Sequence, residues 1–87
     1  MHRRDRDEFG DVYRSVGERI AAERARRSVS QRELAQLTGT TQSAVARLEG
    51  GSRAPRLDTL LRVAHALDCA LELELRPRTR IDEEVTP

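Results

Sequence analysis

Four side chains between positions 42 and 47 have the chemistry needed to recognise the edges of DNA base pairs. A glutamine amide can pair bidentately with adenine, an arginine guanidinium can do so with guanine, and an alanine methyl can touch the thymine methyl. The four residues are Gln42, Ser43, Ala46 and Arg47. Because this spacing falls on one face of an α-helix, a helix here would present all four together.

Two short helices joined by a tight turn are predicted around these side chains. Ser30 and Glu33 form a capping box, in which each side chain accepts a hydrogen bond from the other residue's backbone amide, so a helix begins here. Gly39 ends that helix because glycine tolerates a positive φ, and Thr41 can cap the next helix, Gln42 to Glu49. The side chains expected to face inward are Leu34, Ala35, Leu37, Val45 and Leu48.

A longer helix is predicted before this pair, ending at Arg27. A four-residue period favours a start near Asp11, whereas a second capping box, Ser15 with Glu18, would start the helix later. We predict the longer helix. Four residues recur at this period on one face of the helix, and they are Val12, Val16, Ile20 and Arg24.

A basic loop and a last helix follow the pair. The loop, GGSRAPR, contains two glycines and a proline, and Arg53 and Arg56 make it positively charged. A helix is then predicted from Leu57 to Leu67, with Asp58 favourably placed near its positive end. Its inward residues would be Leu57, Leu60, Leu61, Ala64 and Leu67.

DNA phosphates would be contacted from both sides of the two short helices. Gln31 and Thr41 stand at helix N-termini, where the backbone amides favour anions. Arg53 and Arg56 would approach the backbone from the basic loop.

The pattern changes to strict alternation in residues 69–77, CALELELRP. Leu71, Leu73 and Leu75 would point to one side, and Glu72 and Glu74 to the other. This predicts one amphipathic β-strand. Because no second strand is predicted, its partner would be the same strand of another copy across a twofold axis. The alternative is a further helical turn with a frayed tail, since Leu and Glu also favour helices.

The pattern SQRELAQLTGTTQSAVARLEGG, followed by RAP and LDTLLRVAHAL, resembles the Cro and phage-repressor family, also called the Xre family. The resemblance covers residues 16–67 and implies double-stranded DNA as a partner. It also implies a λ-repressor-like fold, an all-α helix-turn-helix bundle of four to five helices, to which this chain adds the C-terminal strand. The matching positions are Ala35, Gly39, Val45, Leu48 and the exit Glu49-Gly50-Gly51.

Particular residues match functional and structural positions of that family. Gln42, Ser43 and Arg47 match its base-contacting positions. Arg24 and Glu49 match positions that form a buried ion pair in phage repressors, the alternative being that both are solvated.

Two positions depart from the family pattern. Ser28 stands where many relatives have glycine. Serine adopts the left-handed conformation at the end of the preceding helix less easily than glycine does. Arg56 stands where relatives often have a capping serine, so the cap of the last helix is in doubt while a cation is added near the DNA.

The composition argues against several other classes of function. The single cysteine, Cys69, cannot form an intramolecular disulfide, and His2 and His65 are isolated, so we expect no metal, no cofactor and a cytoplasmic location. No apolar run approaches the length of a membrane span. No nucleophile or paired acids accompany the polar residues, so we assign no catalytic residue. The net charge of +1 for 87 residues conceals a locally basic stretch between residues 31 and 62.

A single DNA-binding domain is predicted at residues 11–68, between a disordered arm at 1–10, a dimerisation strand at 69–77 and a flexible tail at 78–87. Arg3, Arg4 and Arg6 of the arm could instead reach DNA, although interleaved acidic residues oppose this. The expected function is a repressor that binds a palindromic operator as a homodimer. The alternative is an antitoxin that neutralises a protein toxin and represses its own operon, and a phage-type or restriction-control regulator is also left open.

Overall fold

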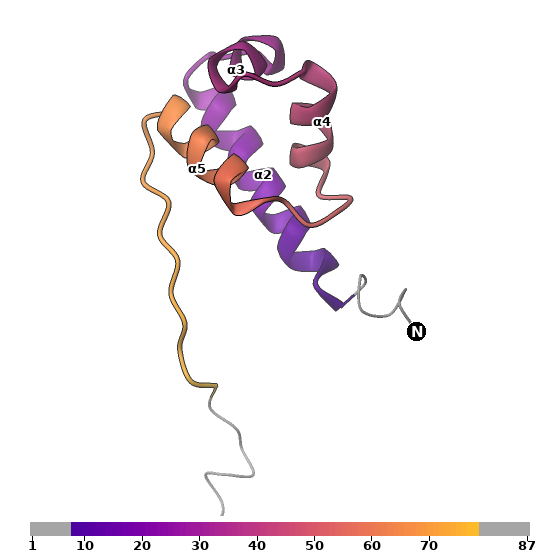
Figure 1. Ribbon diagram of the computed structural model, residues 1–87, viewed down its shortest axis with the longest axis vertical. Helices are drawn as coiled ribbons and strands as arrows, with labels where there is room; N and C mark the ends of the chain where they lie inside the picture. Colours follow the sequence, from indigo (N-terminus) through magenta and orange to yellow (C-terminus); the bar gives the residue numbers. More distant parts are fainter. Residues whose placement is uncertain (1–7, 79–87) are drawn as a thin grey trace, which may run out of the picture.

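Residues 8–78, the part of the chain that this computed structural model describes, form a bundle of four helices (Figure 1). They are α2 (Gly10–Arg26), α3 (Gln31–Thr38), α4 (Gln42–Gly50) and α5 (Leu57–Ala66). α4 packs against α2 and α3, and α3 also packs against α5. The all-α helix-turn-helix bundle predicted from the sequence is therefore confirmed.

The predicted capping residues fix the start of α3 and the turn between α3 and α4. Ser30 Oγ accepts a hydrogen bond from the Glu33 amide at 3.0 Å, and Glu33 Oε1 accepts one from the Ser30 amide at 2.7 Å. Gly39 ends α3 with a φ of 73°. Thr41 Oγ1 then accepts from the Ala44 amide at 3.1 Å and starts α4. Together these bonds set the direction in which α4 leaves the turn.

α2 begins at Gly10, so the longer of the two predicted helices is confirmed and the later start at Ser15 is wrong. The helix ends at Arg26, with Arg27 as its C-cap. Ser28 follows with a φ of 57°, the left-handed conformation that a glycine would adopt more easily.

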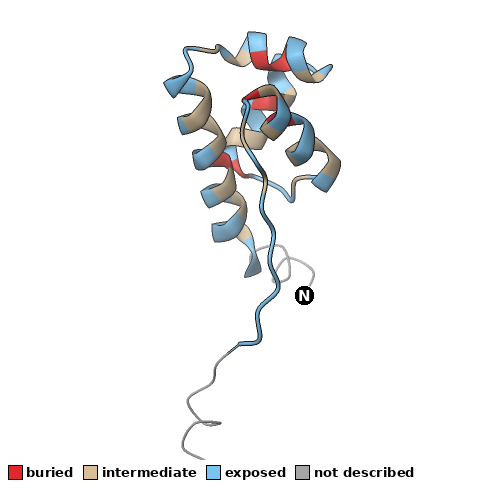
Figure 2. Ribbon diagram, turned by 90° about the vertical axis from the view of Figure 1, so that its left-hand side faces the viewer, coloured by how far each residue is buried: buried red, intermediate tan, exposed pale blue. Residues whose placement is uncertain are grey.

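The core lies where α3, α4 and α5 meet, and Figure 2 shows the buried positions clustered among the helices. The prediction that three leucines face the core is wrong, because Leu37, Leu57 and Leu61 are 62%, 52% and 51% exposed. The helical period rotates each of them onto the flank of its helix, away from the centre of the buried face. Val63, which was not predicted, takes a central place on α5. The buried apolar residues are Leu34, Ala35, Val45, Val63 and Leu67.

α2 crosses the end of α4 with the two backbones nearly in contact. Gly17 is buried at this crossing, and a Cβ there would lie 2.6 Å from the carbonyl oxygen of Leu48. Gly51, with a φ of 67°, makes a second close approach, because a Cβ there would lie 2.7 Å from the backbone nitrogen of Arg14. Both positions require glycine, which the helical pattern of the sequence does not indicate.

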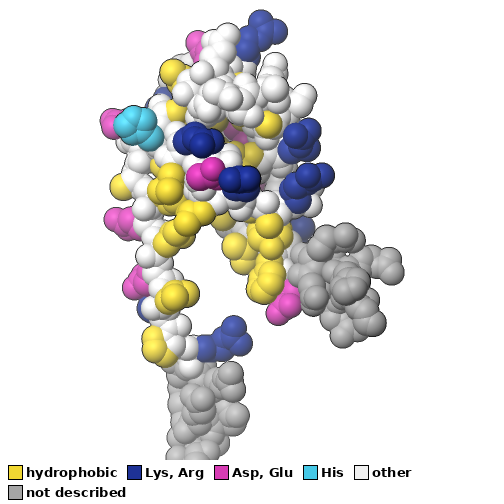
Figure 3. Space-filling view, in the orientation of Figure 1, with side chains coloured by type: hydrophobic (Ala, Val, Ile, Leu, Met, Phe, Trp, Pro, Cys, Tyr) yellow, Lys and Arg dark blue, Asp and Glu magenta, His cyan; other side chains and the backbone are white. Residues whose placement is uncertain are grey.

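Residues 69–78, the C-terminal segment, leave the bundle without regular secondary structure (Figures 1 and 2). The strand predicted at 69–77 is therefore not formed, and neither is the alternative helical turn. A strand needs a second strand for its hydrogen bonds, and residues 8–78 of one chain supply none. Leu73 and Leu75 are consequently 68% and 101% exposed. Figure 3 shows apolar side chains along this segment, facing a hollow beside the body.

Parts of the predicted arm and tail, residues 1–7 and 79–87, lie outside the described residues. Among the residues that are described, no helix is long and apolar enough to cross a membrane.

Replacing Gly17 with alanine is expected to destabilise the protein by about 1 to 3 kcal/mol, the usual range for overpacking a filled contact. In an ordinary helix the same change would stabilise instead, because alanine is the better helix former. Urea unfolding followed by circular dichroism measures the difference. Gly10→Ala is the matched control, since its Cβ would meet the Arg14 guanidinium at an unstrained 3.6 Å. Equal stability of the two variants would contradict the close crossing of α2 and α4.

Candidate nucleic-acid interface

α4 presents one apolar face to the core and one polar face to solvent. Val45 is 2% exposed, and Leu48 packs against the same core. All the residues predicted to contact bases are exposed, and they are Gln42, Ser43, Ala46 and Arg47. The capped, anchored helix therefore displays this set on the molecular surface.

The end of α4 is anchored to α2 by an ion pair. Arg24 Nε lies 2.6 Å from Glu49 Oε2, and Arg24 Nη2 lies 3.0 Å from Glu49 Oε1. Arg24 also donates to the Val29 carbonyl at 2.9 Å, and Gln31 Nε2 donates to Glu49 Oε1 at 3.0 Å. The side chains of Arg24 and Glu49 are 18% and 7% exposed, so the pair is largely shielded from water. α2, α3 and α4 therefore meet at one carboxylate.

The Glu49 carboxylate favours its charged form despite its surroundings. Burial raises the pKa of Glu49, but hydrogen bonds from Arg24 and Gln31 and the charge of Arg24 hold it below the ordinary value of 4.5. The hydrogen bond to Glu49 in turn raises the pKa of Arg24. Because the folded pKa of Glu49 is depressed, its stabilisation is present above the unfolded pKa and is lost as pH falls through the folded value.

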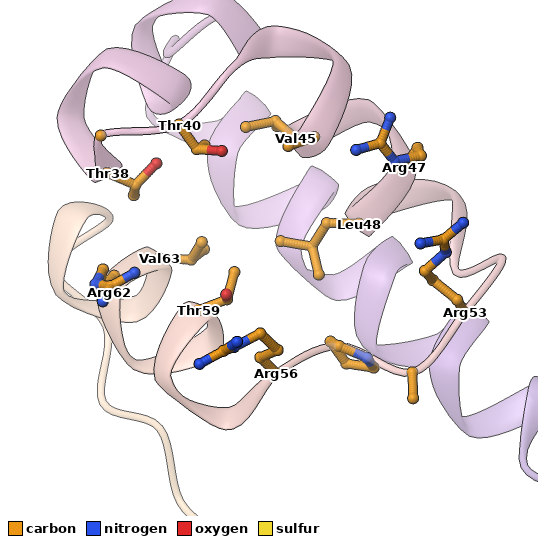
Figure 4. Close-up of a pocket in the computed structure, with 14 residues that line it drawn as sticks. Thr38, Thr40, Val45, Arg47, Leu48, Arg53, Arg56, Thr59, Arg62 and Val63 are labelled. Carbon is orange, nitrogen blue, oxygen red and sulfur yellow. The ribbon is translucent and has the colours of Figure 1, made fainter.

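A basic cleft of about 310 Å³ separates α4 from α5 (Figure 4). Arg47 and Arg53 stand on its α4 side, and Arg56 and Arg62 project from its α5 side. We call this feature the arginine cleft after these four residues. Its floor is apolar, and the hydroxyl of Thr59 lies between the arginines of α5.

The charge of the arginine cleft is only partly neutralised. Arg56 Nε donates to Asp58 Oδ1 at 3.0 Å, and Arg62 Nη2 lies 3.5 Å from Asp58 Oδ2. The hydrogen bond from Arg56 is the main reason that the pKa of Asp58 lies below its usual range. Arg47 and Arg53 form no ion pair with any residue between 8 and 78. The cleft therefore has four arginines and only one neighbouring carboxylate, that of Asp58, so its net charge is positive and attracts anions.

The structure brings some of the predicted phosphate-contacting residues together and separates others. Arg53 and Arg56 line the arginine cleft beside Arg47. Thr41 lies at the start of α4, where its hydroxyl is occupied by capping. The Gln31 side chain donates its hydrogen bond to Glu49. At the start of α3, the groups that can bind an anion are therefore the backbone amides.

Arg62 is a member of the arginine cleft that the sequence analysis did not assign. It lies on α5, beyond the basic loop whose composition drew attention to Arg53 and Arg56. A signal was present, because Arg56, Thr59 and Arg62 are spaced by three residues and share one face of the helix. Among the described residues, no group of acidic, histidine or cysteine side chains could hold a metal ion.

Together, the capped turn, the polar face of α4 and the adjacent arginine cleft are typical of a helix-turn-helix DNA-binding domain. The helix-turn-helix family model matches residues 20–73, and the chain belongs to this family. The resemblance to Cro and phage repressors is thereby confirmed. The family comprises regulators rather than enzymes, in agreement with the prediction that the chain has no catalytic role.

Individual relatives agree with this assignment. The uncharacterised HTH-type transcriptional regulator y4dL of Sinorhizobium fredii is 40% identical over 63 residues, 72% of this chain. The chain spans 31% of the length of that relative. The restriction-modification controller protein C.AhdI from Aeromonas hydrophila has a similar structure, with a TM-score of 0.68 and 32% identity over 71% of this chain and 90% of C.AhdI. The clp gene regulator ClgR from C. glutamicum has a TM-score of 0.65 and 28% identity, covering 67% of this chain and 75% of ClgR.

Removing one partner of the Arg24–Glu49 pair is expected to cost about 3 to 5 kcal/mol of stability, because the other charge is left shielded and unpaired. Arg24→Ala and Glu49→Ala test this in urea titrations at neutral pH. Arg19→Ala is the matched control, since Arg19 belongs to an exposed pair with Glu23 and its loss should cost less than about 1 kcal/mol. If Arg24→Ala were as stable as Arg19→Ala, the anchoring role of the pair would be refuted.

Proposed function

We propose that this protein is a sequence-specific transcriptional repressor that binds a palindromic operator as a homodimer in the cytoplasm. The observation that carries the proposal is the exposed polar face of α4 beside the arginine cleft. Such a repressor occupies promoter DNA and excludes the polymerase, with affinity from phosphates and specificity from base edges.

α4 serves as the recognition helix in this proposal. Gln42 and Ser43 lie in its first turn, the part of a recognition helix that enters the major groove most deeply. Arg47 follows one turn later, and Ala46 offers a methyl group beside it. Gln42 suits adenine and Arg47 suits guanine, while Ala46 suits the methyl of thymine.

The phosphate backbone is held on both flanks of α4. On one flank, the arginine cleft supplies Arg53, Arg56 and the newly recognised Arg62. On the other flank, backbone amides at the start of α3, beside Gln31, and at the start of α4, beside Thr41, offer hydrogen bonds to a phosphate. Arginine suits this role because its planar guanidinium can bind a phosphate with two hydrogen bonds.

A homodimer accounts for the C-terminal segment and for the geometry that DNA requires. Antiparallel pairing of two segments across a twofold axis would satisfy their backbone hydrogen bonds and bring together Leu71, Leu73 and Leu75 of both copies. The same symmetry would hold the two recognition helices at the spacing of one DNA turn, about 34 Å.

A second candidate is an antitoxin that represses its own operon and neutralises a protein toxin. The observation that favours it is the exposure of Leu73 and Leu75, because exposed apolar side chains in a row mark sites of protein contact. The two candidates share the DNA chemistry and differ in what covers the C-terminal segment. An adjacent gene for a small toxin would decide for the antitoxin.

Truncating the base-contacting side chains should weaken specific binding while the fold stays intact. Gln42→Ala and Arg47→Ala are each expected to cost about 1 to 3 kcal/mol in operator binding, the worth of one bidentate base contact. Fluorescence anisotropy with an operator selected from random DNA measures this loss. Arg26→Ala, at the exposed end of α2, is the control and should bind like the original chain. Unchanged operator affinity in the Gln42→Ala/Arg47→Ala double variant would refute base reading by α4.

The arginines of the loop should act on all DNA sequences alike. Arg53→Ala and Arg56→Ala are each expected to weaken operator and random DNA equally and to reduce the slope of affinity against salt by about one. Titrations at several salt concentrations measure the slope, with Arg26→Ala again as control. A slope that stays the same in both variants would mean that the loop does not face the backbone.

A further inference from the structure

A second cavity, of about 310 Å³, opens between α2 and α5. Val16 and Ile20 line it from α2, Leu60 and Ala64 line it from α5, and residues 69–72, the start of the C-terminal segment, also line it. We call it the α2–α5 groove. Its lining is predominantly apolar, unlike that of the arginine cleft.

The α2–α5 groove stays open because the two helices pack on other partners. α2 packs against α4, and α5 packs against α3. Of the apolar side chains that line the groove, Val16, Ile20, Leu60 and Ala64 are therefore only half-buried. Val12, Leu57 and Leu61 are large apolar side chains left exposed on the same two helices. Removing apolar surface from water is favourable, so a segment that covers the groove would stabilise the molecule.

The C-terminal segment carries apolar side chains that have no place in their own chain. Leu71 lines the groove, but the segment then runs away from the body, and Leu73 and Leu75 are 68% and 101% exposed. Asp68, with a φ of 56°, lies where the chain turns out of α5 toward this path. Figure 3 shows the apolar side chains of the segment and those of the body on opposite sides of a hollow.

We propose that in the dimer each C-terminal segment crosses to the other copy and places Leu73 and Leu75 in that copy's α2–α5 groove. The inference rests on the homodimer proposed above and adds to it a receiving site on the helices. One chain supplies both the unfilled groove and the unplaced leucines, and a second copy satisfies both at once, reciprocally.

The dimensions of the segment and the groove suit this exchange. From Leu71, which lines the groove of its own chain, an extended chain reaches roughly 13 Å to Leu75, enough to contact a second copy that packs directly against the first. A cavity of about 150 Å³ can hold a benzene molecule, so the groove has room for leucine side chains.

Mixing two defective variants tests the exchange. Leu73→Asp/Leu75→Asp removes the inserted side chains, and Ala64→Arg fills the groove. Each variant alone is expected to raise the dimer dissociation constant by about 100-fold or more, since burial of one leucine is worth at least tenfold in affinity. Ala22→Arg, on an exposed position of α2, is the control and should dimerise normally.

In a mixture, the heterodimer has one normal segment opposite one normal groove. Analytical ultracentrifugation of the two variants together should therefore show dimers at concentrations where each variant alone is monomeric. If the mixture stays monomeric even at a protein concentration about 100 times the dissociation constant of the original dimer, the exchange is overturned. An Ala64→Arg variant that dimerises normally while the segment variant does not also overturns it, but leaves strand pairing in the dimer intact. If both variants dimerise normally, the role of the segment in the proposed homodimer fails as well.

A second measurement does not depend on a variant that fills the groove. Chains carrying Cys69→Ser and Glu74→Cys receive a nitroxide label and are mixed with isotope-labelled chains of the original sequence. The exchange predicts paramagnetic broadening of amides around Val16, Ile20 and Ala64 of the isotope-labelled chain. Broadening confined to residues 70–77 of that chain would show paired strands without insertion and would overturn the proposal.

Discussion

The orientation of the recognition helix depends on the Glu49 carboxylate, which holds α2, α3 and α4 together. α3 and α4 have 8 and 9 residues, too short to be stable as isolated helices, so packing and anchoring must hold them in place. Thr41 fixes α4 at its first turn, Val45 in its middle and Glu49 near its end. The crossing at Gly17 brings α2 close enough for Arg24 to reach that carboxylate. The orientation of α4 is therefore a property of the whole bundle.

Features governed by neighbouring residues could be predicted from the sequence. The capping box of Ser30 and Glu33, the left-handed Gly39 and the cap at Thr41 are local, so their sequence pattern carries nearly all the information that the turn requires. The same holds for the exposed face of α4, which follows from the helical period once the ends of the helix are known. The Arg24–Glu49 pair joins distant parts of the chain, and it was reached through the family resemblance rather than through spacing.

Features that depend on distant packing were missed or mistaken. In α5, apolar side chains occur over more than half of the circumference, so the sequence does not show that Val63 is central while Leu57 and Leu61 lie on the flank. The need for glycine at position 17 arises from the carbonyl groups of α4, some thirty positions away. Alternation after Cys69 favoured a strand and left a further helical turn as the alternative, and neither forms in residues 69–78. A strand requires a partner, and residues 8–78 of one chain contain none.

The arginine cleft carries a positive charge that does not change with physiological pH. All sixteen lysine or arginine residues of the chain are arginine and none is lysine. A guanidinium stays protonated throughout the physiological range, and the Arg56 pKa is raised further by its hydrogen bond to Asp58. Lysine acetylation, which removes a positive charge from a protein surface, has no acceptor side chain here. Neither protonation nor lysine acetylation can therefore alter the charge of the four arginines that define the cleft.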